Sequence, residues 1–217
     1  MSPLTLYDYP ASGNCSKVRL LLAQLGLEYE RVPTDIFDGD TLTDEFAELN
    51  PLRSTPVLQL EDGRTLIESN AILWYLAAGT PLLPEDPFEQ AEVCRWLIYE
   101  QSDVMPMIGG LRFRLITGRI EHHSDAAERR RTGAHEALAL LDRHLATRDF
   151  LLGDSYSIAD IAVYAYAHVA GEATVETAGY PAFRRWLTRV EATPGFMNGL
   201  EPYPPNASVL AGRSTYG

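Results

Sequence analysis

Residues 50–72 read NPLRSTPVLQLEDGRTLIESNAI, and this stretch carries the clearest structural signals in the chain. Pro56 opens a short apolar run that predicts a strand, because the first residue of a strand need not donate to the ladder. Asp62-Gly63 predicts a tight hairpin turn into a second strand. That strand ends at Glu68-Ser69, where Ser69 is placed to cap a helix with Ile72, Leu73 and Leu76 on one face.

The junction at Glu68-Ser69 has the chemistry of a receptor for a zwitterion. Backbone N–H groups and the dipole at a helix start attract a carboxylate, while the Glu68 carboxylate can hold an ammonium group. An ordinary hairpin followed by a capped helix would use the same residue types. The order and spacing of all the signals over residues 50–76 favour the receptor.

On these residues the chain resembles the glutathione S-transferase family. In that family, the loop that ends in a cis-proline before the third strand pairs with the cysteinyl part of glutathione, and a Glu/Gln-Ser pair holds the γ-glutamyl group. The resemblance implies that Thr55, Pro56 and Val57 meet the cysteinyl part, and that Glu68 and Ser69 hold the γ-glutamyl group. It also implies glutathione as co-substrate and a homodimer.

The first third of the chain predicts a mixed α/β domain over residues 1–79. Leu4–Tyr7 alternates as a strand, a helix with apolar residues Val18, Leu21, Leu22 and Leu25 ends at Gly26, and a second strand lies near residues 28–32. An irregular acidic stretch over 35–50 precedes the hairpin. The order βαβ and then ββα is that of a thioredoxin-like layer, with a right-handed crossover between the first two strands.

Residues 80–87 predict a linker, because three prolines there follow Gly79 and cannot continue a helix. Residues 88–217 predict an all-helical bundle, with helices near 88–116, 125–147, 157–170 and 181–193 and an irregular tail after Gly195. The first of these helices is interrupted by Pro106 and Gly109-Gly110. Ser157, with Asp160 three residues later, predicts a capping box at the start of the third helix. A thioredoxin-like domain followed by an all-helical domain is the architecture of the soluble glutathione transferases.

The chemistry is expected where the first strand turns into the first helix. A thiol is nucleophilic as its thiolate, and a hydroxyl or amide donor at a helix start lowers the pKa of a thiol by hydrogen bonding to the charged form. Ser12 is the first candidate donor and Asn14 the second, in both cases by similarity to family members. Cys15 is the third, because the beta class places a cysteine in this loop. Ser12 or Asn14 can also serve only as a cap, Cys15 only as a buried apolar residue, and Lys17 and Arg19 are expected on the helix surface.

Two further sets of contacts are expected. The common family contact to the glycyl carboxylate is missing in its usual form, and Arg53 can supply a bidentate guanidinium instead. The electrophile is expected in an interdomain cleft lined by the first long helix, with Tyr99, Met105 and Arg112 as its candidate residues. Each of these three can instead belong to the core or to the solvated surface.

Composition limits the class of partner. With a net charge of −12 and Arg129-Arg130-Arg131 as the only basic run, nucleic acid is excluded as a partner. Two distant cysteines and five histidines without ligand spacing predict no metal site. No apolar run suits a membrane span and the start lacks a secretion signal, so the expectation is a cytoplasmic protein without membrane contact. The predicted function is glutathione conjugation in detoxification. Glutathione-dependent disulfide reduction, as in nu-like relatives, and a non-catalytic transferase-like scaffold are the alternatives.

Overall fold

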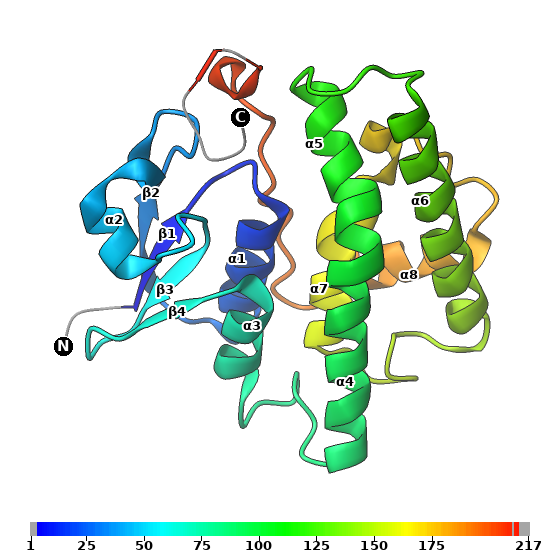
Figure 1. Cartoon of the computed structure of the whole chain (residues 1–217). Coiled ribbons are helices and arrows are strands. Elements are labelled where there is room, and N and C mark those ends of the chain that lie inside the picture. Colours follow the sequence, from blue (N-terminus) through cyan, green and yellow to red (C-terminus); the bar gives the residue numbers. More distant parts are fainter. Residues whose placement is uncertain (1–3, 210, 213–217) are drawn as a thin grey trace. The chain divides into compact units, whose positions relative to one another are not determined.

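The computed structural model describes residues 4–209, 211 and 212 (Figure 1). The chain divides into two compact units, and each is described by itself. Unit 1 comprises the chain up to Leu76 together with the segment from Met197 onward, and unit 2 comprises Ala77–Phe196.

Unit 1 is built on a four-stranded mixed sheet with the strand order β2-β1-β3-β4. Strands β1 (Leu4–Asp8) and β2 (Tyr29–Pro33) are parallel and are connected by α1 (Gly13–Leu25). Strand β3 (Val57–Gln59) is antiparallel to both β1 and β4 (Thr65–Ile67), and α3 (Ser69–Ala77) follows β4. Helices α1 and α3 lie on one face of the sheet and α2 (Asp44–Leu49) lies on the other (Figure 1). The predicted thioredoxin-like fold is confirmed.

Local sequence signals explain the turns of unit 1. Gly26 ends α1 with a φ of 63°, a conformation that glycine adopts without steric cost. Gly63, with a φ of 86°, forms the hairpin turn, which is closed by a 2.8 Å hydrogen bond from the Leu60 N–H to the Arg64 carbonyl. Both turns lie where the sequence predicts them.

Residues 35–50 were predicted to be irregular, and the structure differs from that prediction. They contain a short 3-10 helix, η1 (Asp40–Leu42), followed by α2. The Thr43 hydroxyl caps α2 by accepting the Phe46 N–H at 3.1 Å, and the buried Phe46 ring meets Tyr7 edge-on. A helix of six residues is too short to display a periodic apolar face, so the sequence signal is limited to one cap and one apolar residue.

Unit 2 is helical, as predicted. Its elements are α4 (Pro87–Tyr99), η2 (Glu100–Gly109), α5 (Gly110–Ile116), α6 (Asp125–His144), η3 (Leu145–Thr147), α7 (Ile158–Ala167), η4 (Ala170–Ala173) and α8 (Pro181–Glu191). The apolar core contains Trp96, Leu138 and Trp186, all fully buried.

The predicted interruption near Pro106 takes the form of a π-helical segment, η2, between α4 and α5. Figure 1 shows α4 and α5 as parts of one continuous rod. Gly109 is needed here, because a Cβ atom at that position would lie 2.2 Å from the Tyr166 ring. Gly133 on α6 likewise makes room for Met107, whose sulfur would lie 2.8 Å from an added Cβ.

A capping box begins α7, as the sequence predicts. The Ser157 hydroxyl accepts the Ala159 N–H at 3.2 Å, and the Asp160 carboxylate accepts the Ser157 N–H at 3.0 Å. The fully buried Asp160 also accepts the Leu151 N–H at 2.9 Å and the Trp186 indole N–H at 2.8 Å. Asp160 therefore joins three parts of unit 2 through one carboxylate.

The C-terminal segment differs from the predicted second domain, which extends to residue 217. From Met197 onward the described residues, which include η5 (Pro205–Ala207), belong to unit 1. The Glu201 N–H donates to the Pro10 carbonyl at 3.2 Å, and the Asn206 side chain donates to Asp35 at 2.8 Å. An irregular segment shows no periodicity, so its sequence alone does not predict the surface on which it packs.

Candidate functional site

Ser12 stands at the start of α1, where β1 has turned toward the helix. Its backbone is extended and its hydroxyl accepts the Cys15 N–H at 3.3 Å, so Ser12 is the N-cap. A hydroxyl both accepts and donates, and this acceptor bond leaves its proton for another group. The half-buried Ser12 therefore combines a donor with the positive end of a helix dipole.

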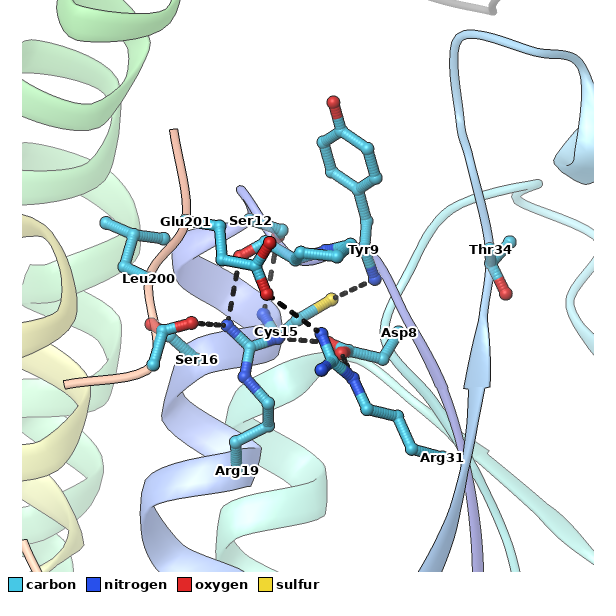
Figure 2. A network of polar contacts seen from close by, with 12 residues as sticks. Asp8, Tyr9, Ser12, Cys15, Ser16, Arg19, Arg31, Thr34, Leu200 and Glu201 are labelled. Atoms are coloured by element: carbon cyan, nitrogen blue, oxygen red, sulfur yellow. Dashed lines mark hydrogen bonds and ion pairs between the residues drawn. The ribbon is translucent and has the colours of Figure 1, made fainter. Parts of the chain in front are cut away.

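Cys15 lies inside unit 1 with no exposed surface. Burial, aided by the charge of Asp8, raises the pKa of the Cys15 thiol to about 11, although hydrogen bonds with Thr55, Tyr9 and Ser12 oppose this shift. The Cys15 sulfur accepts the Tyr9 N–H at 3.4 Å and points to it in Figure 2. A thiol with this pKa stays protonated near neutral pH, which disfavours a nucleophilic role for Cys15.

The loop before β3 has the backbone that the family resemblance implies. The Thr55–Pro56 peptide bond is cis, and Pro56 and Val57 are buried. The buried Asn50 holds this loop: its side-chain nitrogen donates to the Ser54 carbonyl at 2.7 Å, and its side-chain oxygen accepts the Leu52 N–H at 2.9 Å.

Glu68 and Ser69 form the start of α3. The helix begins one residue earlier than predicted. The Glu68 carbonyl accepts the Ile72 N–H at 3.0 Å, so Glu68 takes the capping position and Ser69 is the first helical residue. Glu68 has a φ of 67°, a left-handed conformation that is uncommon for a non-glycine residue and costs on the order of 1 kcal/mol. Its side chain is exposed, whereas Ser69 is buried.

Asn14 connects the two helix starts. Its side-chain oxygen accepts the Ser69 hydroxyl at 3.2 Å and the Lys17 ammonium at 3.0 Å. Lys17 is fully buried and also donates to the Ser69 hydroxyl and to the Asn70 side chain, each at 3.3 Å. The prediction that Lys17 lies on the surface of α1 is wrong, because α3 covers this face of the helix.

Arg19, also predicted on the surface, is buried in an ionic network (Figure 2). Its guanidinium and that of Arg31 each pair with one oxygen of the fully buried Asp8 carboxylate. Arg19 also donates to the carbonyls of Pro10 at 3.0 Å and Gly199 at 2.8 Å. This network ties the C-terminal segment to the loop that leads to Ser12, so it fixes the site without forming part of it.

The Arg53 guanidinium contacts other residues of unit 1. It donates to the carbonyls of Thr41 at 3.2 Å and Thr43 at 2.8 Å, and it pairs with the exposed Asp44 at 3.5 Å. These three interactions use three of the five guanidinium N–H donors, so the contact with a glycyl carboxylate need not replace any of them and stays a prediction.

The predicted electrophile residues belong to unit 2, where two of them face its interior. The Tyr99 hydroxyl donates to the Ala137 carbonyl at 3.2 Å, and its ring packs edge-on against Trp96. Arg112 is buried and pairs with Glu172 at 2.7 Å. Met105 is half-buried in η2. Tyr99 and Arg112 therefore have packing and ion-pair roles within unit 2, and their contact with an electrophile stays a prediction.

Two kinds of feature are absent from the described residues. No group of three His, Cys, Asp or Glu side chains in this part of the chain is arranged to hold a metal ion. No helix among the same residues has the length and apolarity needed to cross a membrane.

Sequence comparison identifies both parts of the chain. Residues 11–78 match the glutathione S-transferase N-terminal domain, and residues 124–189 match the glutathione S-transferase C-terminal domain. Glutathione S-transferase 3 of Zea mays is 31% identical over 97% of this chain and 100% of its own. The chain belongs to the glutathione S-transferase family.

Other relatives of this chain are named as elongation factors. Elongation factor 1-gamma of Artemia salina is 29% identical over 84% of this chain, which spans only 43% of that protein. The family thus includes longer proteins in which a region like this chain is one part.

Solved structures agree with the family assignment. A glutathione S-transferase from Pseudomonas fluorescens has a TM-score of 0.88 and 40% identity, over 92% of this chain and 100% of its own. A second family member from Pseudomonas fluorescens, with two glutathione molecules bound, has a TM-score of 0.82 and 30% identity, over 92% and 93%. Structural neighbours of this transferase-family chain therefore bind glutathione.

Proposed function

We propose that this chain is a glutathione transferase that binds glutathione in unit 1 and conjugates its sulfur to a small electrophile. The observation that carries the proposal is the 3.2 Å hydrogen bond from the Ser69 hydroxyl to Asn14. It supports a single site that combines the candidate thiol donors at the start of α1 with the candidate γ-glutamyl receptor at the start of α3.

The residues at the start of α3 fit the γ-glutamyl group. This group carries an ammonium and a carboxylate on the same carbon atom. Glu68 supplies an exposed carboxylate for the ammonium, and the first N–H groups of α3 supply donors for the carboxylate. A solved relative with glutathione bound supports the same ligand here.

Ser12 and Asn14 support activation of the thiol. Ser12 keeps its hydroxyl proton for a thiolate, and the Asn14 amide nitrogen is opposite the oxygen that Ser69 and Lys17 hold. Ser12 caps α1 and Asn14 lies in its first turn, where the helix dipole also favours a negative charge. We assign Cys15 to packing and leave Thr55, Pro56 and Val57 as the proposed contacts for the cysteinyl part.

The proposed reaction is a substitution at an activated carbon. The glutathione thiol loses its proton to water, the thiolate forms a carbon–sulfur bond, and the leaving group, for example chloride, departs with its electron pair. Hydrogen bonds that are stronger to the thiolate than to the thiol raise the reactive fraction at neutral pH.

Calorimetry with glutathione, followed by a conjugation assay with a chloronitroaromatic substrate, tests the proposal. We expect binding in the micromolar to millimolar range that is typical of enzyme substrates, and turnover above the uncatalysed rate. S-methylglutathione should bind as well but give no product. No binding of either compound would contradict the proposal.

A second candidate function is glutathione-dependent disulfide reduction, in which two glutathione molecules are oxidised to their disulfide and one substrate disulfide is reduced to two thiols. The relative with two bound glutathione molecules favours this candidate. We rank it below conjugation, because two anionic tripeptides repel each other and the chain itself has a net charge of −12.

A scaffold role is the candidate outside enzymology, and the likeness to elongation factor 1-gamma favours it. A scaffold needs neither a thiol donor nor a γ-glutamyl receptor, so the arrangement of Ser12, Asn14, Glu68 and Ser69 supports an enzyme. Glutathione binding without any turnover would support the scaffold.

We further propose a cytoplasmic homodimer, in which unit 1 of one subunit meets unit 2 of its partner. Leu52 on unit 1 and Phe88 on unit 2 support an interface, because these large apolar side chains are 59% and 73% exposed. Sedimentation at micromolar concentration should give a dimer for the parent protein, and Leu52→Asp should weaken it. A monomeric parent protein would contradict this assembly.

A further inference from the structure

Lys17 is the only lysine among the 18 basic Lys and Arg residues of the chain. It is also one of the largest fully buried side chains. Burying an ammonium is costly unless it receives hydrogen-bond partners, so a chain that uses arginine everywhere else has a specific need for lysine at this position.

The geometry explains why lysine meets this need. The Lys17 ammonium donates to three side-chain oxygens, those of Asn14 at 3.0 Å and of Ser69 and Asn70 at 3.3 Å each. An ammonium is a compact group with three donors around one nitrogen, whereas a guanidinium is a planar fork that suits paired acceptors. Three oxygens that converge on one point from two helices therefore favour lysine over arginine.

Lys17, Asn14 and Ser69 form a closed ring of hydrogen bonds. Lys17 donates to both partners, and the Ser69 hydroxyl donates to the same Asn14 oxygen. Because the Asn14 oxygen is held inward by two donors, its amide nitrogen is directed to the opposite side. Because the Ser69 proton is held by Asn14, the orientation of the Ser69 hydroxyl depends on Asn14 as well.

We propose that Lys17 is a positioning residue that couples the γ-glutamyl end of the glutathione site to its thiol end, by holding Asn14 and Ser69 in one ring. The inference rests on the proposed function. Lys17 itself touches neither reacting atom. A ligand that changes the bonds of Ser69 changes those of Asn14 through the ring, so the two ends of glutathione act as one unit on the protein.

The single lysine permits a direct measurement. Protein labelled with carbon-13 at the lysine Cε gives one lysine signal, which reports on Lys17 alone. Saturation with glutathione or with S-methylglutathione, which keeps the γ-glutamyl group, should shift this signal. Cysteinylglycine, which lacks that group, should shift it less. If glutathione binds by calorimetry and the signal does not move, the inference is wrong, whereas absence of binding contradicts the proposed function instead.

Lys17→Met tests the coupling. We expect glutathione to bind at least tenfold more weakly and the pKa of its bound thiol to rise, so that both ends of the ligand are affected. Lys17→Arg should not restore either property, because a guanidinium cannot place three donors at one point. Arg64→Met is the matched control: it removes one positive charge from the exposed hairpin turn and should change neither property. Parent-like binding and thiol pKa in Lys17→Met would overturn the inference.

A second set of variants decides the question even if Lys17→Met does not fold. Asn14→Ala, Ser69→Ala and the double variant remove only small side-chain groups. If the ring couples the two residues, the fold-increase in the Kd of the double variant should be clearly smaller than the product of the fold-increases in the two single variants. Losses that multiply to within twofold would show independent residues and overturn the inference.

Discussion

Asn14 and Ser69 are 55 residues apart in sequence, yet the Ser69 hydroxyl donates to the Asn14 side chain at 3.2 Å. The bond joins the first turn of α1 to the first turn of α3. We propose on this basis that two positive helix ends and four polar side chains, Ser12, Asn14, Glu68 and Ser69, form one site. This relationship is the basis for the predictions that follow.

Glu68→Ala should weaken glutathione binding. Loss of a carboxylate that pairs with an ammonium typically costs on the order of 2 kcal/mol, or about thirtyfold in Kd. Isothermal calorimetry measures the Kd of the parent and of the variant directly. The matched control is Glu61→Ala, which removes an exposed carboxylate from the hairpin turn, at the end of β4 away from Glu68, and should bind as the parent does. Equal affinities for the parent and Glu68→Ala would remove Glu68 from the site.

Ser12→Ala should raise the pKa of bound glutathione by about one unit, because a hydrogen bond to a charged group contributes roughly 1.5 kcal/mol or more and one unit corresponds to about 1.4 kcal/mol. Affinity should change little. Ultraviolet titration of the bound thiolate measures the pKa. Ser12→Thr keeps both the hydroxyl and the helix cap and should behave as the parent does. If Ser12→Ala titrates like the parent, Asn14 or the backbone N–H groups of α1 become the main donors.

The two cysteines should differ in reactivity. Cys15 is buried with a thiol pKa of about 11, whereas Cys94 is exposed. A thiol reagent at pH 8 should therefore modify one cysteine per folded chain and two after denaturation, and peptide mapping should assign the first to Cys94. Rapid modification of Cys15 in the folded protein would contradict its assignment to packing and reopen a mixed-disulfide mechanism.

Asp160 should make stability depend on pH. Burial raises its pKa from 3.8 to about 6 in the folded protein, although hydrogen bonds from Trp186, Leu151 and Ser157 oppose this shift. Between these two values the folded state holds a proton that the unfolded state has released. The free energy of unfolding should therefore fall as pH rises from about 4 to 6, by up to about 3 kcal/mol from this group.

Asp160→Asn isolates this contribution, because asparagine does not titrate and all other titratable groups are the same in the two proteins. Denaturant unfolding at pH 4.5 and pH 6.5 should show the parent losing stability relative to Asp160→Asn as pH rises. A constant difference between the two proteins would mean that the hydrogen bonds keep Asp160 ionised across this range.

Sequence patterns predicted those parts of the structure that depend on neighbouring residues. The turn at Gly63, the end of α1 at Gly26 and the capping box at Ser157 each need only a few adjacent residues to form. The start of α3 was placed within one residue for the same reason. The family resemblance supplied the cis bond before Pro56 and the pairing of Glu68 with Ser69.

Features that depend on distant contacts were not predicted. Lys17 and Arg19 have the side chains of a helix surface, and only their contacts with Ser69, Asn70 and Asp8 place them inside the protein. The presence of a single lysine three residues after Asn14 was the available signal. The Tyr99 hydroxyl contacts Ala137, 38 residues away, and Arg112 pairs with Glu172, 60 residues away, so no local sequence pattern predicts either contact.

The central claim is that unit 1 activates glutathione for transfer to an electrophile. Its most direct test is the rate at which the purified protein conjugates a chloronitroaromatic compound with glutathione, compared with its rate on hydroxyethyl disulfide and with the Ser12→Ala variant. We predict faster conjugation than disulfide reduction, and slower conjugation in Ser12→Ala at neutral pH. Glutathione binding without conjugation above the uncatalysed rate, or disulfide reduction as the much faster reaction, would contradict the claim.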